Sequence, residues 1–359
     1  MKIDFPLNNL GLHLELTDKC QASCPMCPRN SYGGPERSHV ANTEITLEQI
    51  KKWFTPEFLQ KVSYIYACGN NGDPLMARDC LEIFKYFREH CKPNTTLAIH
   101  TNGSLRNTEW WVELAKIIGK DGFVVFAIDG WKGEHELYRR GTFWDKIIDN
   151  AKAFIGAGGE ARADTLVFRH NEQRIYELRD YLLGLGFSQV NLKATQRFYG
   201  IDQYPVKNKD DEIEYYLSPA MHEEWNIKMP KPNYVRLYDK NEFDIMLKSA
   251  IVDPSCSKGS TLYINTFGKV YPCCWVGSLV ENSDTFIADY KERAVRNRLM
   301  QSAHDLMADI GMIDLNGSDM LTEISKVDWN GSIGKHWTTD PKFVCVKSCG
   351  TNFAEIISK

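Results

Sequence analysis

The first half of the chain alternates between short apolar runs and longer amphipathic stretches. Six apolar runs have the length and composition of buried strands: Leu12–Leu16, Val62–Ala67, Thr96–His100, Phe123–Ile128, Ala163–Phe168 and Gln189–Lys193. Between them, apolar residues at helical spacing predict helices over Leu47–Lys61, Asp79–His90, Thr108–Ile118, Phe143–Ile155 and Glu172–Leu185. Strands that alternate with helices in this way predict an α/β fold with a parallel sheet and right-handed crossovers.

A polar or glycine-rich segment follows each of these expected strands. A cysteine-containing loop follows the first strand. The other five segments are residues 69–74, 101–103, 129–130, 169–171 and 194–196. In parallel barrels the catalytic groups gather at the carboxyl ends of the strands. The pattern therefore predicts six βα units whose functional residues share one rim.

Three cysteines, Cys20, Cys24 and Cys27, lie within eight residues after the first expected strand. A structural zinc site needs four protein ligands, and this loop supplies no fourth Cys or His. An iron–sulfur cube held by three thiolates instead leaves one iron open to another ligand. A zinc knuckle and a redox-active thiol cluster are the alternatives that the spacing leaves open.

The C-x3-C-x2-C spacing resembles the signature of the radical S-adenosylmethionine (SAM) superfamily. The resemblance implies a partial (βα)6 TIM-like barrel, a [4Fe-4S] cluster on Cys20, Cys24 and Cys27, and SAM bound to the fourth iron. One-electron reduction then cleaves SAM to a 5′-deoxyadenosyl radical, which is chemistry that the cofactor supplies. Family members often carry an aromatic residue before the third cysteine, where this chain has Met26.

The segment Asn71-Gly72-Asp73-Pro74 resembles the GGEP motif of this family. In that motif, backbone groups and the acidic residue hold the amino group of SAM. The glycine would let the backbone approach the ligand closely. This chain differs at two positions, with Asn in place of Gly and Asp in place of Glu, and an ordinary turn is the alternative interpretation.

Residues 127–141 resemble the fourth strand and following loop of the subgroup that contains sulfatase-maturing and peptide-modifying enzymes. This resemblance implies that Asp129 contacts the ribose of SAM. It also implies that Arg139 or Arg140 binds the carboxylate, which suits the forked guanidinium group. Asn102 and Thr195, at the ends of the third and sixth strands, are further candidates for SAM binding.

The last third of the chain carries a second group of cysteines: Cys256, Cys273, Cys274, Cys345 and Cys349. Alternating apolar residues between Leu262 and Tyr271 predict a β-hairpin. A cysteine before this hairpin and a Gly-x4-Cys at its end resemble the start of a SPASM domain. Five cysteines in place of seven resemble the shortened Twitch form, which implies one auxiliary [4Fe-4S] cluster on Cys256, Cys273, Cys345 and Cys349. A zinc ribbon built from the same four sulfurs is the alternative.

The remaining cysteines receive simpler interpretations. We expect Cys274 to lie in an extended strand and to point away from Cys273. It would then be buried, or it would donate a hydrogen atom to a product radical. We expect Cys68, Cys80 and Cys91 in the core, because free cysteine is among the most buried residue types.

These patterns predict a barrel over residues 1–200, a bridge with a charge run over 201–250, and a SPASM/Twitch-like domain over 251–359. The formal net charge of −4 and the absence of a Lys/Arg stripe argue against a nucleic-acid partner. No apolar run approaches the roughly 20 residues of a membrane helix. Eleven cysteines without an export signal favour reduced thiols in the cytoplasm.

The sequence therefore predicts a radical SAM enzyme that abstracts hydrogen from an unactivated carbon of a small-molecule or peptide substrate. The outcome would be an oxidation, a crosslink or an epimerisation, with flavodoxin or ferredoxin as the electron donor. About ten residues precede the first strand, too few for a domain that binds a leader peptide. This slightly favours a small metabolite as the substrate. A peptide-modifying maturase, an RNA-modifying enzyme of the same superfamily and a non-catalytic zinc module are the alternatives.

Overall fold

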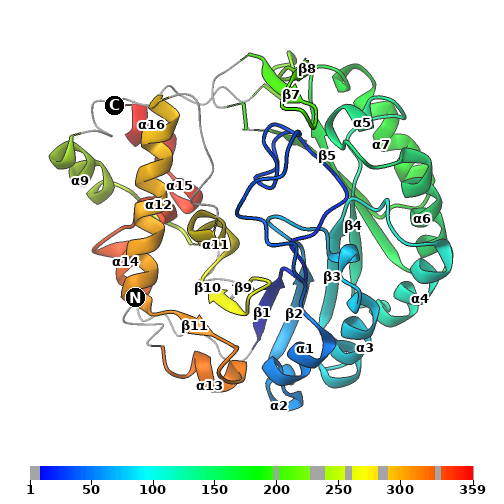
Figure 1. The fold of residues 1–359 in the computed structure, drawn as a ribbon, viewed down its shortest axis with the longest axis horizontal. Helices are drawn as coiled ribbons and strands as arrows, with labels where there is room; N and C mark the ends of the chain where they lie inside the picture. Colours follow the sequence, from blue (N-terminus) through cyan, green and yellow to red (C-terminus); the bar gives the residue numbers. More distant parts are fainter. Residues whose placement is uncertain are drawn as a thin grey trace. The chain divides into compact units, whose positions relative to one another are not determined.

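The computed structural model describes residues 9–195, 197–198, 202–226, 239–254, 261–281, 290–327 and 333–358 (Figure 1). The chain divides into two compact units. The barrel unit comprises Leu14–Ile50 and Ser63–Lys228, and the C-terminal unit comprises Met1–His13, Lys51–Val62 and Met229–Lys359. Residues 201–250, which we expected to form a bridge, are thus shared between the two units.

The strands of the barrel unit follow one another in sequence order. β2 (Val62–Ala67), β3 (Thr96–Thr101), β4 (Phe123–Ala127), β5 (Glu160–Val167) and β6 (Gln189–Ala194) pair in parallel. β1 (Leu10–Leu14) ends at Leu14, the residue at which the barrel unit begins. The predicted α/β fold with a parallel sheet is confirmed. β1 begins two residues earlier than predicted and β5 three residues earlier.

The helices of this part of the chain match the prediction with one exception. α3 (Cys80–His90), α4 (Thr108–Ile118), α6 (Trp144–Gly156) and α7 (Ile175–Gly184) lie outside the strands in Figure 1, with the short α5 (His135–Tyr138) before α6. The predicted helix Leu47–Lys61 is two helices, α1 (Leu47–Trp53) and α2 (Pro56–Leu59). The second helix restarts because Thr55 caps it and Pro56 has no N–H to continue the first.

Apolar packing joins the outer helices to the sheet. Trp111 of α4 stacks on Phe126 of β4 with ring centroids 5.0 Å apart, and Phe154 of α6 contacts both rings edge-on. All three side chains are fully buried. Burial of such aromatic side chains supplies most of the stabilisation in a layer of this kind.

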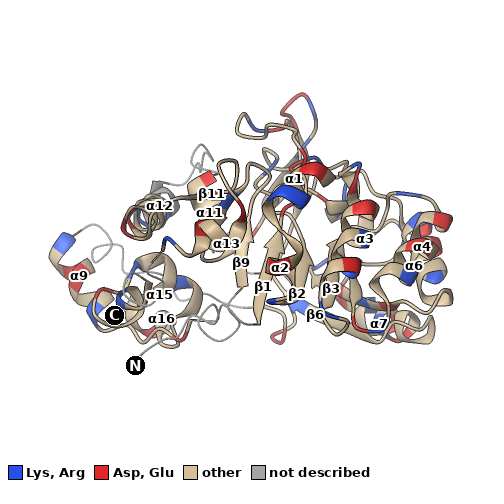
Figure 2. Ribbon diagram, turned by 90° about the horizontal axis from the view of Figure 1, so that it is seen from below, with Lys and Arg blue, Asp and Glu red and all other residues tan. Residues whose placement is uncertain are grey.

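The solvent face of the helices carries both signs of charge. Lys85 of α3 pairs with Glu82 at 3.0 Å and with Glu113 of α4 at 3.8 Å, and Lys116 pairs with Glu113 at 3.6 Å. Figure 2 shows the acidic and basic residues side by side on these helices. Exposed pairs of this kind add little stability, but they leave this face without a concentrated positive field.

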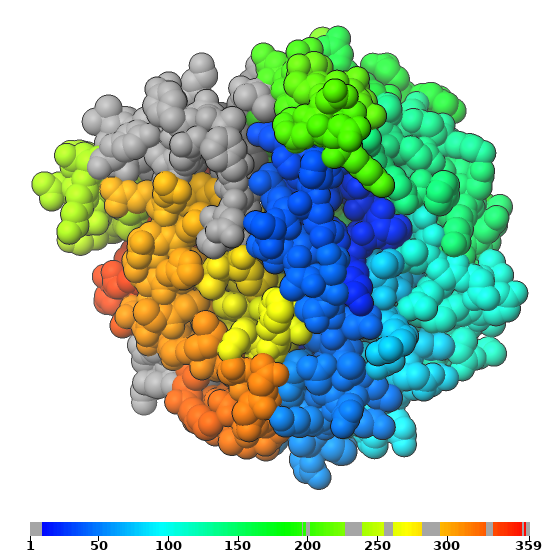
Figure 3. All heavy atoms as spheres, in the orientation of Figure 1, coloured from blue at the N-terminus to red at the C-terminus, as the bar shows by residue number. Residues whose placement is uncertain are grey.

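A hairpin follows the barrel strands. It consists of β7 (Tyr204–Lys207) and β8 (Ile213–Leu217), and the charge run at 208–212 forms its turn. The backbone N–H of Lys207 donates to the carbonyl of Tyr32 at 2.9 Å. Figure 3 shows the loop that contains Tyr32, in blue, packed against this green hairpin.

The C-terminal unit contains the predicted hairpin, formed by β9 (Thr261–Ile264) and β10 (Lys269–Tyr271). Its other elements are α9 (Lys240–Lys248), α11 (Cys274–Glu281), α12 (Tyr290–Ile310), β11 (Ile313–Asp314), α13 (Met320–Ile324), α14 (Lys335–Thr338), α15 (Phe343–Cys349) and α16 (Phe353–Ser358). Phe243, Leu299, Phe343 and Phe353 are members of its apolar core. None of the helices in the described ranges is long and apolar enough to cross a membrane.

A glycine before β4 gives a test of the barrel packing. A Cβ atom at Gly122 would lie 2.2 Å from the carbonyl oxygen of Leu97 and 2.4 Å from Cγ2 of Ile118. Gly122→Ala should therefore lower the free energy of unfolding by about 1–3 kcal/mol, the usual cost of overpacking. Urea unfolding followed by circular dichroism measures this. The control is Gly184→Ala in α7, where a Cβ meets nothing within 4 Å; equal destabilisation by both changes would contradict the prediction.

Candidate active site

The loop after β1 is fixed by its own polar side chains. The Asp18 carboxylate accepts the N–H groups of Ala41 at 2.9 Å and Thr43 at 2.5 Å. The buried Arg29 guanidinium donates to the carbonyl of Asp18 and to Asn42. These contacts connect both ends of the loop across the cysteine segment, so the cysteines sit on a rigid support.

Cys20, Cys24 and Cys27 gather at a largely apolar cluster of side chains. Cys24 and Met26 are buried in a cluster with Tyr138 and Phe168, and Cys20 and Cys27 pack against it. Burial raises the pKa of Cys24 to about 11 and also raises the pKa values of Cys20 and Cys27, and each thiol is close enough to affect another. The thiols are therefore neutral unless a metal takes the place of the proton.

Among the described residues, the group of three potential ligands within 4.8 Å of one another is Asp309, His336 and Asp340. The sulfurs of Cys20, Cys24 and Cys27 do not form such a compact group. The cysteine loop supplies three sulfurs, whereas a structural zinc site needs four protein ligands.

Hydrogen-bond donors are directed at two of the sulfurs. The N–H of Ala22 lies 3.4 Å from Sγ of Cys20, and Nδ2 of Asn102 lies 4.0 Å from it. Nη1 of Arg139 lies 4.0 Å from Sγ of Cys24. Donors around a ligating sulfur stabilise its negative charge and tune the metal centre. Cluster ligation by these thiols is therefore chemically consistent with their surroundings.

The loop at residues 69–74 packs directly against the cysteine loop. A Cβ on Gly72 would lie 1.8 Å from the carbonyl oxygen of Thr17. The buried Glu15 accepts the N–H groups of Asn71 at 2.7 Å and Gly72 at 3.1 Å. We expected glycine at residue 72 because it lets the backbone approach SAM. In the structure, the backbone at Gly72 instead closely approaches the backbone of Thr17.

Asp73 is not a free carboxylate. Its two oxygens accept Oγ1 of Thr101 at 2.9 Å, the N–H of Asn102 at 2.8 Å, Nδ2 of Asn102 at 2.6 Å and the N–H of Leu75 at 3.0 Å. Asp73 therefore joins the end of β2 to the end of β3, and Pro74 begins the 3-10 helix η1 (Pro74–Met76) that it caps. Oδ1 of the neighbouring Asn71 is buried and has no partner among the described residues. That atom is the acceptor this loop leaves available for a ligand.

Asp129 and Arg139 form a buried pair at the end of β4. Nε of Arg139 donates to Oδ2 of Asp129 at 2.5 Å, and the N–H of Leu166 donates to Oδ1 at 2.6 Å. Burial raises the pKa of the Asp129 carboxyl, and Arg139 opposes that shift. The side chain of Arg139 is 21% exposed, and it extends from Asp129 toward the sulfur of Cys24.

A neutral histidine and an asparagine hold this pair in place. Burial lowers the pKa of His135 to about 3. Its Nδ1 accepts the N–H of Asp129 at 3.1 Å, so Nε2 carries the proton and donates to Thr142 at 2.9 Å. Asn171, also buried, donates to the carbonyls of Asp129 at 3.0 Å and Leu166 at 2.9 Å. The end of β4 is thereby fixed to β5.

Two of the expected residues do not join this cluster. The Arg140 guanidinium donates to the carbonyl of Lys207 and to Glu214 of the hairpin. The Arg140 guanidinium therefore binds the β7–β8 hairpin, whereas the Arg139 guanidinium lies beside the sulfur of Cys24. Thr195 accepts the N–H of Arg197 at 3.3 Å, and Arg197 in turn donates to the carbonyl of Met26 at 2.9 Å.

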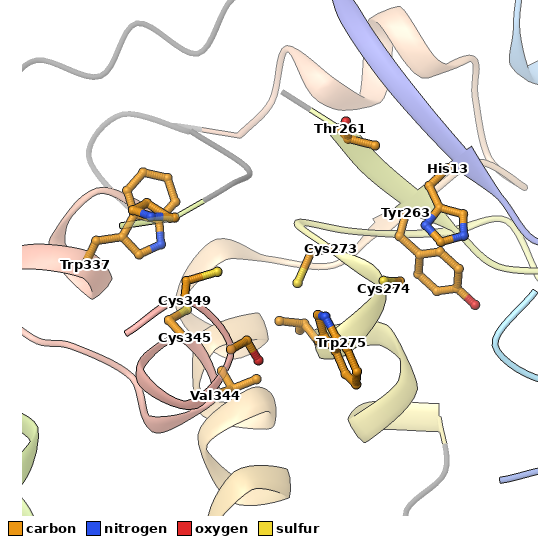
Figure 4. Close-up of a pocket in the computed structure, with 13 residues that line it drawn as sticks. His13, Thr261, Tyr263, Cys273, Cys274, Trp275, Trp337, Val344, Cys345 and Cys349 are labelled. Atoms are coloured by element: carbon orange, nitrogen blue, oxygen red, sulfur yellow. The ribbon is translucent and has the colours of Figure 1, made fainter. Parts of the chain in front are cut away.

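The C-terminal cysteines line one cavity of 270 Å³ (Figure 4). Cys345 and Cys349 lie one turn apart on α15, and Cys273 immediately precedes α11. Burial raises the pKa of Cys273, while the N–H groups of Trp275 and Val276 donate to its sulfur and Cys349 lies nearby. Cys256 lies outside the described residues.

Cys274 differs from the expectation. The chain turns into helix α11 at this residue, so it is not in an extended strand. Cys273 and Cys274 both line the cavity and do not point to opposite sides of a sheet. Cys80 and Cys91 are buried as predicted, and burial raises the pKa of each to about 12. Cys68 is half-buried at the end of β2.

Comparison with known proteins agrees with this geometry. Residues 14–182 match the family model described as the radical SAM superfamily. This part of the chain is thus similar to a radical SAM domain, and it contains the cysteine loop after β1 and the end of β4.

Solved structures are similar to this chain at low sequence identity. Hexahistidine-tagged anSMEcpe with bound AdoMet is 15% identical with a TM-score of 0.52, over 98% of this chain and 91% of that chain, and it shares the fold. Streptococcus suis SuiB is 16% identical with a TM-score of 0.49, over 81% of this chain and 65% of that chain. This chain thus spans less than two thirds of the SuiB chain.

Several residues of the site were not predicted from the sequence. They are Glu15, Gln21, His135, Asn171 and Arg197. Each acts by holding another side chain or a loop, and none belongs to a motif with a fixed spacing. Gln21, His135 and Asn171 lie in segments that the sequence singled out: the cysteine loop, residues 127–141 and the polar segment after the fifth strand.

The two adjacent arginines give a matched test. Arg139→Gln should weaken SAM binding at least about tenfold, because it removes a charged donor beside Cys24 and leaves the buried Asp129 unpaired. Arg140→Gln should leave SAM binding unchanged and make the β7–β8 hairpin more sensitive to protease. Isothermal titration of the reconstituted protein and limited proteolysis measure the two effects. Equal loss of SAM affinity in both variants would show that the assignment is wrong.

Proposed function

We propose that this enzyme uses the SAM-bound cluster on Cys20, Cys24 and Cys27 to abstract hydrogen from an unactivated carbon of a small-molecule or peptide substrate. The observation that carries this proposal is the gathering of Cys20, Cys24 and Cys27 at one apolar cluster, with Arg139 and Asn102 directed at their sulfurs. When bound, the cluster and SAM supply one-electron chemistry that produces a carbon-centred radical.

The protein's own residues orient SAM. Oδ1 of Asn71, buried without a partner in the described part of the chain, accepts the amino group of SAM. Arg139 offers its guanidinium to the carboxylate, while Asp129 keeps the guanidinium oriented from the other side. Asp73 takes no direct part in this proposal, but it fixes Asn102 next to Cys20.

Loss of one loop thiol tests the proposal. Cys24→Ala should abolish release of 5′-deoxyadenosine from SAM and remove about half of the bound iron, since the remaining cysteines still hold the second cluster. Iron and acid-labile sulfide analysis of anaerobically prepared protein, with chromatography of the nucleoside, measures both. Cys91→Ala changes a core cysteine and is the control. Zinc without iron in the wild-type protein would contradict the proposal.

The cavity of the C-terminal unit holds the proposed auxiliary [4Fe-4S] cluster. Its support is the gathering of Cys273, Cys345 and Cys349 around one cavity and the two backbone N–H groups directed at the sulfur of Cys273. Donation of this kind stabilises a ligating thiolate. With Cys256 as the fourth ligand, the set would be complete, as the sequence predicts. An electron donor such as flavodoxin or ferredoxin completes the proposed system.

The second cluster has its own test. Cys349→Ala should spare reductive cleavage of SAM and remove about half of the iron, but it should disable conversion of substrate. Absorbance near the cluster bands, iron content and 5′-deoxyadenosine release distinguish this variant from Cys24→Ala. Full iron content or undiminished product from Cys349→Ala would refute the role of the auxiliary site.

A further inference from the structure

The inner face of the barrel carries polar side chains that the proposed SAM site does not use. Tyr66 on β2, His100 on β3, Asp164 on β5 and Lys193 on β6 belong to this face, because side chains on a strand alternate between its two sides. The exposed fractions of the side chains are 25% for His100, 14% for Asp164 and 49% for Lys193. Outward-facing neighbours on the same strands, such as Ile99, are fully buried under the helices.

These side chains form a connected line. Oη of Tyr66 lies 2.7 Å from Nδ1 of His100, and Nε2 of His100 lies 3.8 Å from Oδ2 of Asp164. Asp164 is held from its other side by Lys193 at 2.6 Å and Asn191 at 2.9 Å. With Nε2 facing a carboxylate, the imidazole proton belongs on Nε2, and Nδ1 accepts the phenol O–H. This is the hydroxyl–imidazole–carboxylate order of a general-base site.

The line passes over β4 because that strand offers small apolar residues there. His100 is in register with Val125, and Asp164 is in register with Ala127. The contact between His100 and Asp164 therefore crosses β4 diagonally, between the positions of Val125 and Ala127. In the described strands, the contacts of the line run between β2, β3, β5 and β6, and β4 adds no polar group to them.

Along their strands, His100 and Asp164 lie two residues before the positions that carry the proposed SAM contacts. His100 precedes Asn102 by two residues, and Asp164 precedes Leu166, whose N–H binds Asp129, by two residues. Two residues of a strand span about 7 Å. Tyr66 and His100 therefore lie on the inner face of the strands, within about 7 Å of the proposed SAM contacts.

We propose that Tyr66, His100 and Asp164 relay the proton that the substrate loses during its oxidation, an inference that rests on the proposed function. Tyr66 accepts the proton from a substrate O–H or N–H group while it passes its own proton to Nδ1 of His100. The imidazolium that forms is stabilised by the Asp164 carboxylate. The relay thus delivers one proton from the substrate to the protein.

The balance of the reaction defines the substrate class. The hydrogen atom on the reacting carbon leaves with the group derived from SAM, and one electron leaves to an iron–sulfur centre. The remaining proton leaves the oxygen or nitrogen through the relay, and a C=O or C=N bond forms. The substrate is accordingly an alcohol or a primary amine with hydrogen on the same carbon, either as a small molecule or as a peptide side chain.

The test uses the reconstituted full chain and a panel of small alcohols, polyols, amino sugars and peptides containing serine or lysine. At least one member should stimulate 5′-deoxyadenosine release and give a product lighter by two hydrogens. With that compound, Tyr66→Phe and His100→Gln should lower kcat by about 100-fold, the usual contribution of general acid–base catalysis, without a matching rise in KM. Asp164→Asn is a second variant should either of these fail to fold.

Tyr64→Phe is the matched control, since Tyr64 lies on the same face of β2 and stacks on Tyr66 with centroids 6.0 Å apart. It should leave kcat within about twofold, because it removes a hydroxyl outside the relay. All variants should keep the slow substrate-independent release of 5′-deoxyadenosine. Equal effects of Tyr64→Phe and Tyr66→Phe would overturn the relay. A wild type that cleaves SAM but responds to no panel member would overturn the substrate class, and one that cleaves no SAM would overturn the proposed function and the relay with it.

Discussion

The candidate active site depends on the close backbone contact between Gly72 and Thr17. A side chain at residue 72 would overlap the Thr17 carbonyl oxygen, so only glycine lets the loop after β2 reach the cysteine loop. The N–H of Asp73 then donates to the carbonyl of Lys19 at 2.9 Å, and the Asp73 carboxylate holds Asn102. Asn102 returns to the cysteine loop through Gln21 at 2.7 Å. The result is a closed circuit of contacts around Cys20, in which the ligand positions are set before any cofactor binds.

The sequence predicted the strands and helices of the barrel well, because they leave local patterns. The strand at Val62–Ala67 and the helix at Thr108–Ile118 have the predicted bounds. Cysteine spacing and glycine content are similarly local. The predicted single helix over Leu47–Lys61 was wrong, because one residue interrupts the hydrogen-bonding of the helix. Apolar spacing runs through Pro56, but proline cannot continue the hydrogen-bonding of a helix.

The roles of individual side chains were harder to predict, since they depend on partners distant in the sequence. Asp73 resembles a ligand of SAM by its place in a motif, yet donors from β3 occupy its oxygens. Arg139 and Arg140 are indistinguishable in the sequence. One faces Cys24 and the other faces the hairpin because successive residues after α5 point in different directions. Cys274 likewise required the three-dimensional position of α11.

Ala127 has a consequence that concerns variation among related enzymes. The residue carries no functional group, and it lies at the end of β4, between the two strands that supply His100 and Asp164. A bulkier aliphatic side chain there would separate an acid from a base without altering either of them. Two barrels of this kind with the same polar residues can therefore differ in their reactions because the side chain at the position of Ala127 differs in size. Comparisons of such enzymes should consider the sizes of lumen residues as well as the identities of the polar ones.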